Sequence, residues 1–229
     1  VNDNNPATEP WYVVVGTTEN EWDQLTGNFT FRNIAVKLNK GSGTPTNPTY
    51  YGDVSRSFED GHSVLNTADN SLVIAATCVV GPEEGSIVLF EVDENLIFDE
   101  QKDFKYFRPN DISFGAADNT YHAKSIDILP ESRGYIVSMN HEKTTDSEHD
   151  ICIMQLNENL ENQWSKFFGY NNDQSSFSTL EDAGAVIAVT EQIEGTSTPR
   201  LSGYAFTGTF GMATNEMMGL VKINAEGEQ

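Results

Sequence analysis

The sequence contains few basic residues. Lys and Arg total 13 against 35 Asp and Glu in 229 residues, so the formal net charge at pH 7 is −22. A surface of this charge repels phosphate backbones and anionic lipid head groups, which argues against a nucleic-acid-binding or membrane-surface protein. The same charge is compatible with cation binding and with simple solubility.

Cysteine is also scarce. Cys78 and Cys152 are the two cysteines, and each lies in or beside an apolar run. We expect two buried free thiols that behave as small apolar residues; a disulfide is the alternative, and the spacing does not decide between them. No metal-ligand pattern surrounds either residue.

Long apolar runs and helical periodicity are absent as well. No stretch approaches the length of about 20 apolar residues that spans a bilayer. No segment repeats apolar residues at i, i+3, i+4 and i+7 over three turns, and β-branched and aromatic residues dominate the apolar runs. We therefore expect an all-β chain without a transmembrane segment.

The usual catalytic signatures are missing. There is no Gly-x-Ser-x-Gly elbow and no glycine-rich phosphate loop, and the dipeptide Trp22-Asp23 occurs once, in a polar stretch. We assign no catalytic residue and no cofactor. Paired carboxylates are frequent at this charge and are interpreted as solvated turns; examples are Glu83-Glu84, Asp99-Glu100 and Glu181-Asp182.

One short phrase recurs four times along the chain. Each copy is an alternating apolar run that ends on Asn or Asp, and the steps between these final residues are 54, 64 and 67. A second, mostly apolar phrase keeps the same spacing, with steps of 60, 63 and 69. Two phrases in register indicate an internal repeat of about 60 residues. The first phrase is found at Val36–Asn39, Phe90–Asp93, Met154–Asn157 and Val221–Asn224, and the second at Tyr12–Gly16, Leu72–Ala76, Tyr135–Met139 and Tyr204–Gly208.

The repeat is interpreted as four short strands. In its clearest copy the strands are Ser125–Leu129, Tyr135–Met139, Ile151–Leu156 and Leu160–Phe168, separated by turns and one polar loop. Four antiparallel strands per unit are the composition of a β-propeller blade. We predict an all-β β-propeller with about four recognisable four-stranded blades; a stacked solenoid is the alternative. The expected core residues are Tyr135, Val137, Ile151, Ile153 and Leu156.

The repeats also set the domain boundaries. Residues 1–10 are polar and rich in Asn and Pro, and we predict a flexible leader there. The blades are expected at approximately residues 11–60, 61–121, 122–174 and 175–229. The first repeat opens at its second strand and the fourth stops after its third, so we expect the chain to form part of a larger ring, or a partner to cover its open edges. Because no Met precedes Val1, we expect a segment before it.

The third repeat carries the fullest version of the pattern. Gly134–Val137, Asp150–Asn157 and Gln163–Gly169 follow the form GGYIV, then D-hydrophobic-KLN-x-G, then W-x-K-x-[FY]-G-G. This pattern resembles a propeller repeat of secreted proteins and surface lipoproteins of Gram-negative bacteria, and the four repeats extend the resemblance over nearly the whole chain. The resemblance implies an extracytoplasmic, usually non-enzymatic module, often tethered to a membrane or to a larger complex.

One loop has the composition of a metal site. His141 and His149 flank an acidic segment that contains Asp146, Glu148 and Asp150. Hard cations such as Ca²⁺ bind carboxylate oxygens, so these three carboxylates are candidate calcium ligands. The alternative is a solvated loop, because the segment lacks the Asp-x-Asp-x-Asp-Gly order of an EF-hand.

The loops between strands differ strongly in length, as residues 17–30, 140–149 and 191–202 illustrate. Variable loops on a constant scaffold are typical of a recognition surface. We predict a non-catalytic extracytoplasmic scaffold that mediates protein–protein interaction within a cell-surface or outer-membrane complex. We expect it in the periplasm or at the outer-membrane surface, where a lipid anchor could hold it. The alternative is a carbohydrate-binding or glycan-degrading propeller, in which Trp11, Trp22 and Tyr170 stack on sugars.

Overall fold

The computed structural model describes residues 11–23, 28–52, 57–67, 71–80, 85–98, 105–107, 119–143, 149–169, 181–192, 195, 198–212 and 215–229. The chain forms two compact units, Val1–Tyr106 and Phe107–Gln229, which are described separately. The predicted leader at residues 1–10 and the calcium-ligand candidates Asp146 and Glu148 lie outside the described residues.

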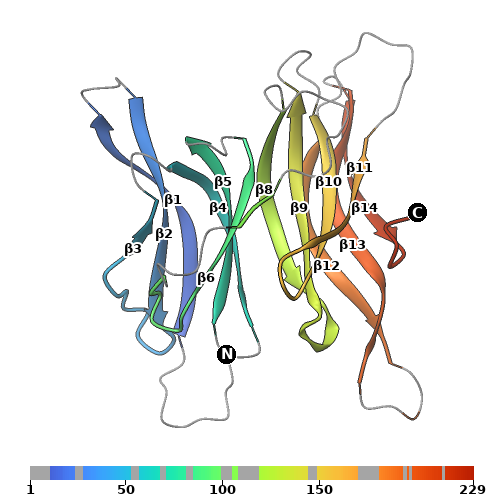
Figure 1. Cartoon of the computed structure of the whole chain (residues 1–229), viewed down its shortest axis with the longest axis horizontal. Helices are drawn as coiled ribbons and strands as arrows, with labels where there is room; N and C mark the ends of the chain where they lie inside the picture. The colour runs from blue at the N-terminus through green and yellow to red at the C-terminus, as the bar shows by residue number, and fades with distance from the viewer. Residues whose placement is uncertain are drawn as a thin grey trace. The chain divides into compact units, whose positions relative to one another are not determined.

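The first unit contains two antiparallel sheets (Figure 1). Sheet 1 has the order β1-β2-β3 and sheet 2 the order β4-β5-β6-β7, so consecutive strands are always neighbours. The bounds are β1 Trp11–Asp23, β2 Asn28–Asn39, β3 Thr49–Tyr51, β4 Ser57–Asn66, β5 Leu72–Val80, β6 Ile87–Val92 and β7 Lys105–Phe107.

The second unit repeats this plan. Sheet 3 has the order β8-β9-β10-β11 and sheet 4 the order β12-β13-β14. A single 3-10 turn, Pro130–Ser132, is the helical element of the described residues. The strand bounds are β8 Asn119–Ile128, β9 Gly134–Lys143, β10 His149–Asn157, β11 Asn162–Phe168, β12 Asp182–Glu191, β13 Arg200–Met212 and β14 Asn215–Ile223.

Successive antiparallel meanders of this kind are β-propeller blades, so the predicted all-β propeller fold class is confirmed. The two recurring phrases occupy adjacent strands in every sheet: β1-β2, β5-β6, β9-β10 and β13-β14. Sheets 2 and 3 have the predicted four strands. In sheets 1 and 4 the described residues form three, which matches the predicted phase of the repeat. Membership of a larger ring stays a prediction.

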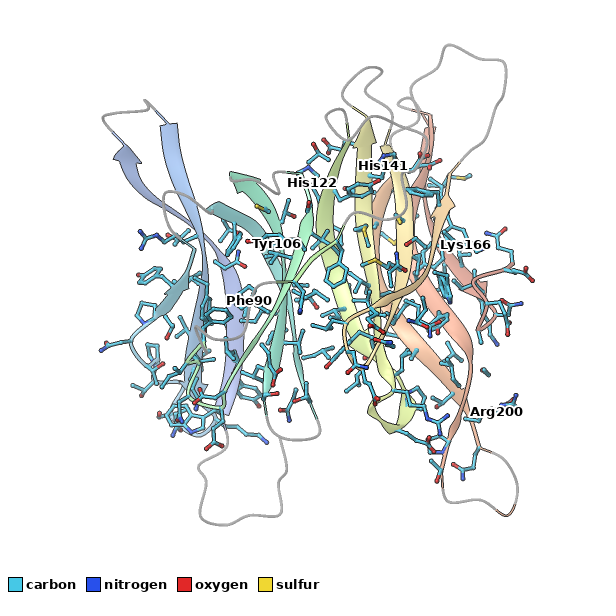
Figure 2. The ribbon with its side chains drawn as sticks, in the orientation of Figure 1. Phe90, Tyr106, His122, His141, Lys166 and Arg200 are labelled. Atoms are coloured by element: carbon cyan, nitrogen blue, oxygen red, sulfur yellow. The ribbon has the colours of Figure 1, made fainter. Side chains whose placement is uncertain are left out.

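Within the first unit the two sheets pack face to face. β4 lies against β1 and β2. Phe90 of β6 is central to this core (Figure 2), with its ring centroid 5.0 Å from that of Tyr51 and 6.2 Å from that of Phe58. The Tyr51 hydroxyl donates a hydrogen bond to the Leu96 carbonyl oxygen at 2.8 Å. Aromatic packing and one buried polar contact therefore fix sheet 2 on sheet 1.

The second unit packs in the same way, with β12 against β8 and β9. The rings of Tyr204 and Phe206 from β13 meet Trp164 and Phe168 from β11, at centroid distances of 5.6 and 4.9 Å. The Tyr204 hydroxyl donates to Gln155 Oε1 at 2.9 Å. The first two strands of one sheet thus cover the face of the preceding sheet in both units.

The core prediction is confirmed for four of its five residues. Val137, Ile151, Ile153 and Leu156 have no exposed surface. The prediction is wrong for Tyr135, which is only partly buried; it is the second residue of β9 and lies close to the turn that precedes the strand.

Two glycines of the second unit directly precede the second recurring phrase, at positions where the backbone leaves no room for a side chain. Gly134 and Gly203 have φ of 131° and 149°, where L side chains are rarely found. A Cβ at either position would collide with a carbonyl oxygen of the next strand, that of Leu156 or Ile223.

Candidate functional site

A cluster of polar and aromatic side chains lies at one end of sheet 3, where Figure 2 labels His122 and His141. We call it the His141 cluster; it consists of Tyr121, His141, Asp150, Phe167 and Glu181. His141 is 3% exposed. Its Nδ1 lies 3.6 Å from Asp150 Oδ2, and its ring stacks on Tyr121 at 4.9 Å and meets the edge of Phe167 at 5.1 Å.

Strand register places these side chains together. Tyr121 of β8 is opposite His141 of β9, which in turn is opposite Asp150 of β10. Directly opposed residues of antiparallel strands point to the same face of the sheet. The sequence therefore builds this row of side chains from three neighbouring strands.

Gly169, which directly follows β11, separates two carboxylates. A Cβ at this residue would lie 2.5 Å from Glu181 Oε2 and 2.6 Å from Asp150 Oδ1. Both carboxylate oxygens therefore border the space that a side chain would occupy. Glu181 is wholly buried, whereas the Asp150 side chain is 27% exposed.

A second polar network joins sheets 3 and 4 beside the cluster. The Asn140 side chain accepts a hydrogen bond from the Ala183 backbone at 2.6 Å and donates to the Asp182 carboxylate. Lys124 Nζ lies 3.7 Å from the same carboxylate. These contacts connect β8, β9 and the start of β12, so they position the two sheets relative to each other.

The structure brings together only part of the predicted metal site. Asp150 lies beside His141, whereas Asp146 and Glu148 fall outside the described residues. His122 Nε2 lies 3.6 Å from Glu142 Oε2. Among the residues that the structure describes, no group of three or more His, Cys, Asp or Glu side chains is arranged to hold a metal ion. The calcium site stays a hypothesis.

The interpretation of Glu181-Asp182 as a solvated turn is wrong for Glu181. Its side chain has no exposed surface, whereas the Asp182 side chain is 63% exposed. Successive side chains of an extended backbone point to opposite faces, so one carboxylate of the pair is buried and its neighbour is exposed. The other two carboxylate pairs, Glu83-Glu84 and Asp99-Glu100, lie outside the described residues.

The remaining sequence candidates have simpler outcomes. Cys78 and Cys152 are buried free thiols, as predicted. Trp11 is half-buried, with Lys37 Nζ 5.4 Å from its ring centroid, so its face already holds a cation. The Trp22 side chain and the whole of Tyr170 lie outside the described part of the chain.

Two exposed apolar surfaces were not predicted from the sequence. The outer face of sheet 1, turned away from sheet 2, consists of Tyr12, Val14 and Tyr50, which are 55%, 50% and 47% exposed. The outer face of sheet 4, turned away from sheet 3, consists of Ile187, Met218 and Leu220, which are 54%, 86% and 73% exposed. Large contiguous apolar surfaces mark interaction sites.

Comparison with known proteins adds little to this description. No protein-family model and no curated protein matches the sequence. Among solved structures, the chain is similar to an exo-1,5-alpha-L-arabinanase from a bovine ruminal metagenomic library, at 10% sequence identity and a TM-score of 0.47. The match covers 95% of this chain and 72% of the arabinanase.

The described residues contain no helix that is long and apolar enough to cross a membrane.

Proposed function

We propose that the chain is a non-catalytic extracytoplasmic β-propeller scaffold that mediates protein–protein interaction within a cell-surface or outer-membrane complex. One observation carries the proposal. Val14, Met218 and Leu220 are exposed on the outer faces of sheets 1 and 4, at repeat positions that are wholly buried in sheet 3. Burial of such surface is favourable by roughly 25 cal/mol per Å², so a partner that covers these faces is stabilised by contact.

The charge of the chain supports a partner made of protein. With a net charge of −22, binding through phosphate contacts is disfavoured, whereas apolar burial does not depend on charge. The extracytoplasmic location and a lipid anchor rest on the resemblance of the repeat alone.

The glycan alternative receives no comparable support. Glycoside hydrolysis needs two carboxylates that flank the substrate. Asp150 and Glu181 adjoin each other, but Glu181 is wholly buried and cannot contact a sugar in this structure. The pair is better explained as part of the polar packing at the end of sheet 3.

The test is cross-linking of the tagged chain in the organism that encodes it, followed by mass spectrometry. We expect specific protein cross-links that disappear in the double variant Val14→Glu/Leu220→Glu. The control is Asn159→Glu, which adds a charge in the exposed turn after β10 and should leave the cross-links unchanged. Cross-links that persist in the double variant, or hydrolysis of polysaccharides by the purified chain, would contradict the proposal.

A further inference from the structure

The internal repeat allows each exposed residue of sheet 4 to be compared with its counterparts. Aligning the recurring phrases places Leu220 at the position of Ile153 in sheet 3, and Met218 at the position of Ile151. Both isoleucines have no exposed surface, whereas Leu220 is 73% and Met218 86% exposed. The corresponding residues of sheet 1, Asn33 and Ala35, are also wholly buried. The outer face of sheet 4 therefore corresponds to faces of sheets 1 and 3 that are buried.

The two packed pairs of sheets show what covers such a face. On sheet 3, Ile151 and Ile153 are covered by the first two strands of the following sheet, including Tyr204 and Phe206 of β13. On sheet 1, Ala35 is covered in the same way by β4 and β5. The fold thus supplies two independent examples of one interface, in which a sheet of the same repeat is the occupant.

The outer face of sheet 1 carries the complementary residues. Tyr12 occupies the repeat position of Tyr204, and Val14 occupies that of Phe206. Tyr204 and Phe206 are at most 1% exposed because they pack on the preceding sheet. Tyr12 and Val14 are 55% and 50% exposed. Each chain therefore exposes two different surfaces. The outer face of sheet 4 corresponds to a face that another sheet covers, and the outer face of sheet 1 corresponds to the face that covers it.

We propose that the outer face of sheet 4 binds the outer face of sheet 1 of a second copy of this chain, head to tail. The contact reproduces the packing of sheet 4 on sheet 3 and of sheet 2 on sheet 1. This inference rests on the proposed function, since it names the partner of the exposed faces. A head-to-tail contact leaves one unused face of each kind at the two ends, so assembly continues until the ends meet in a ring or a filament forms.

A polar contact across the new interface follows from the same comparison. Gln155 of sheet 3 accepts the hydrogen bond of the Tyr204 hydroxyl at 2.9 Å. Lys37, at the equivalent position of sheet 1, donates to the Glu94 carbonyl oxygen at 2.5 Å. Lys222 is exposed at this position in sheet 4. It is placed to donate to the Tyr12 hydroxyl of the second copy.

The experiment measures the mass of the purified chain by light scattering and sedimentation as its concentration is raised. We expect self-association that Val14→Glu and Leu220→Glu each weaken by about 100-fold or more, because each variant buries an unpaired charge in the contact. Both side chains are exposed in the single copy, so neither substitution disturbs the core. Asn159→Glu is the matched control and should associate like the parent chain.

Mixing the two variants distinguishes this contact from other modes of association. Val14→Glu protein retains an intact face on sheet 4, and Leu220→Glu protein retains an intact face on sheet 1. Their mixture should therefore form a 1:1 dimer and stop there. The proposal would be overturned if the parent chain stayed monomeric even at 100 times the concentration used in the sedimentation experiment. It would also be overturned if the two variants did not associate with each other when mixed. A monomeric parent chain that still gives face-dependent cross-links to a different protein would overturn only the choice of partner and leave the proposed function standing.

Discussion

The Asn or Asp that ends each recurring phrase acts through its side chain. Asn157 Oδ1 accepts hydrogen bonds from the backbone of Asn159 at 3.0 Å and of Glu161 at 2.9 Å. Asp93 and Asn224 make the same pair of contacts two and four residues on, and Asn39 makes them two and three residues on. Such Asx contacts shape the turn that follows the third strand.

The positive φ of this turn does not occur at the Asn or Asp itself. It is found at Leu96, Leu160 and Gly227, three residues after the Asp or Asn, and at Gly43, four residues after Asn39. The asparagine is selected for its acceptor oxygen and not for tolerance of a left-handed backbone. Glycine stands at two of these four positions, and only at those two does the sequence indicate a positive φ.

Replacing Asn157 tests this role. Asn157→Ala removes two accepted hydrogen bonds and the one that Asn157 Nδ2 donates to Glu161 Oε2, and it should lower the free energy of unfolding by about 1 kcal/mol. Asn157→Asp keeps the acceptor oxygen but would place a second carboxylate beside Glu161, so it is made together with Glu161→Gln. This double variant should lie within about 0.5 kcal/mol of the Glu161→Gln single variant. Urea denaturation measures both. Equal losses for the two variants would show that the oxygen does not stabilise the turn.

Tyr204 gives a prediction about alkaline pH. Burial of the hydroxyl, reinforced by the negative charge of Glu226, raises the pKa of Tyr204 to about 12. The folded state keeps this proton when the unfolded state has lost it, so the contribution to stability is complete below about pH 10 and is lost as the pH rises towards 12. Burial raises the pKa of Tyr51 in the same direction, with Asp93 adding to the effect.

Spectrophotometric titration near 295 nm measures these hydroxyls directly. The chain has eight tyrosines, and its titration should include a late component of tyrosinate absorbance that develops above about pH 11. Tyr204→Phe should remove part of this late component. A difference spectrum between the two proteins that develops around pH 10 would instead mean that the Tyr204 hydroxyl is open to water.

At the scale of elements, equivalent strands of different sheets have different surroundings. Ile153 of β10 and Leu220 of β14 occupy the same repeat position, but the first is wholly buried and the second is 73% exposed. Truncation should therefore affect them differently. Ile153→Ala should lower the free energy of unfolding by about 2–5 kcal/mol. Leu220→Ala should change it by less than about 0.5 kcal/mol when measured on the single copy at low concentration.

This pair of positions also shows where prediction from the sequence ends. Periodicity and the recurring phrases correctly predicted the strands that carry these phrases and four of the five proposed core residues. The assignment of residues 17–30, 140–149 and 191–202 to loops is wrong in part, because the neighbouring strands extend into all three ranges. The phrases mark only the central residues of each strand, and periodicity does not fix where a strand ends. They could not distinguish Leu220 from Ile153, because burial depends on whether another sheet lies against the face and not on the strand itself. A loss for Leu220→Ala equal to that for Ile153→Ala would mean that the outer face of sheet 4 is part of a core.

Only part of the His141 cluster could be predicted from the sequence. Asp150 could be singled out from the acidic composition of its loop, and His141 from its place beside that loop. Their partners Tyr121 and Glu181 come from other strands, and register between strands brings them together. The inward direction of Glu181 has no counterpart in the local sequence, because Glu181-Asp182 resembles the many solvated carboxylate pairs of this acidic chain.

At the scale of the whole molecule, the outer faces of sheets 1 and 4 are exposed and apolar. We propose that they bind a partner, because the repeat that forms the core of each unit also forms these faces. Sheets left open at a face or an edge are prone to association, and proteins usually cover them. The described structure contains both halves of the required contact.

Oxidative footprinting of Met217 and Met218 tests this claim most directly. The two residues are neighbours on β14, are 72% and 86% exposed, and point to opposite faces of sheet 4. Oxidation of an exposed methionine to its sulfoxide reports access of solvent to that side chain. We predict that Met218 becomes protected as the chain associates with its partner, while Met217 stays reactive. Unchanged oxidation of Met218 in the assembled protein, or protection of Met217 in its place, would contradict it.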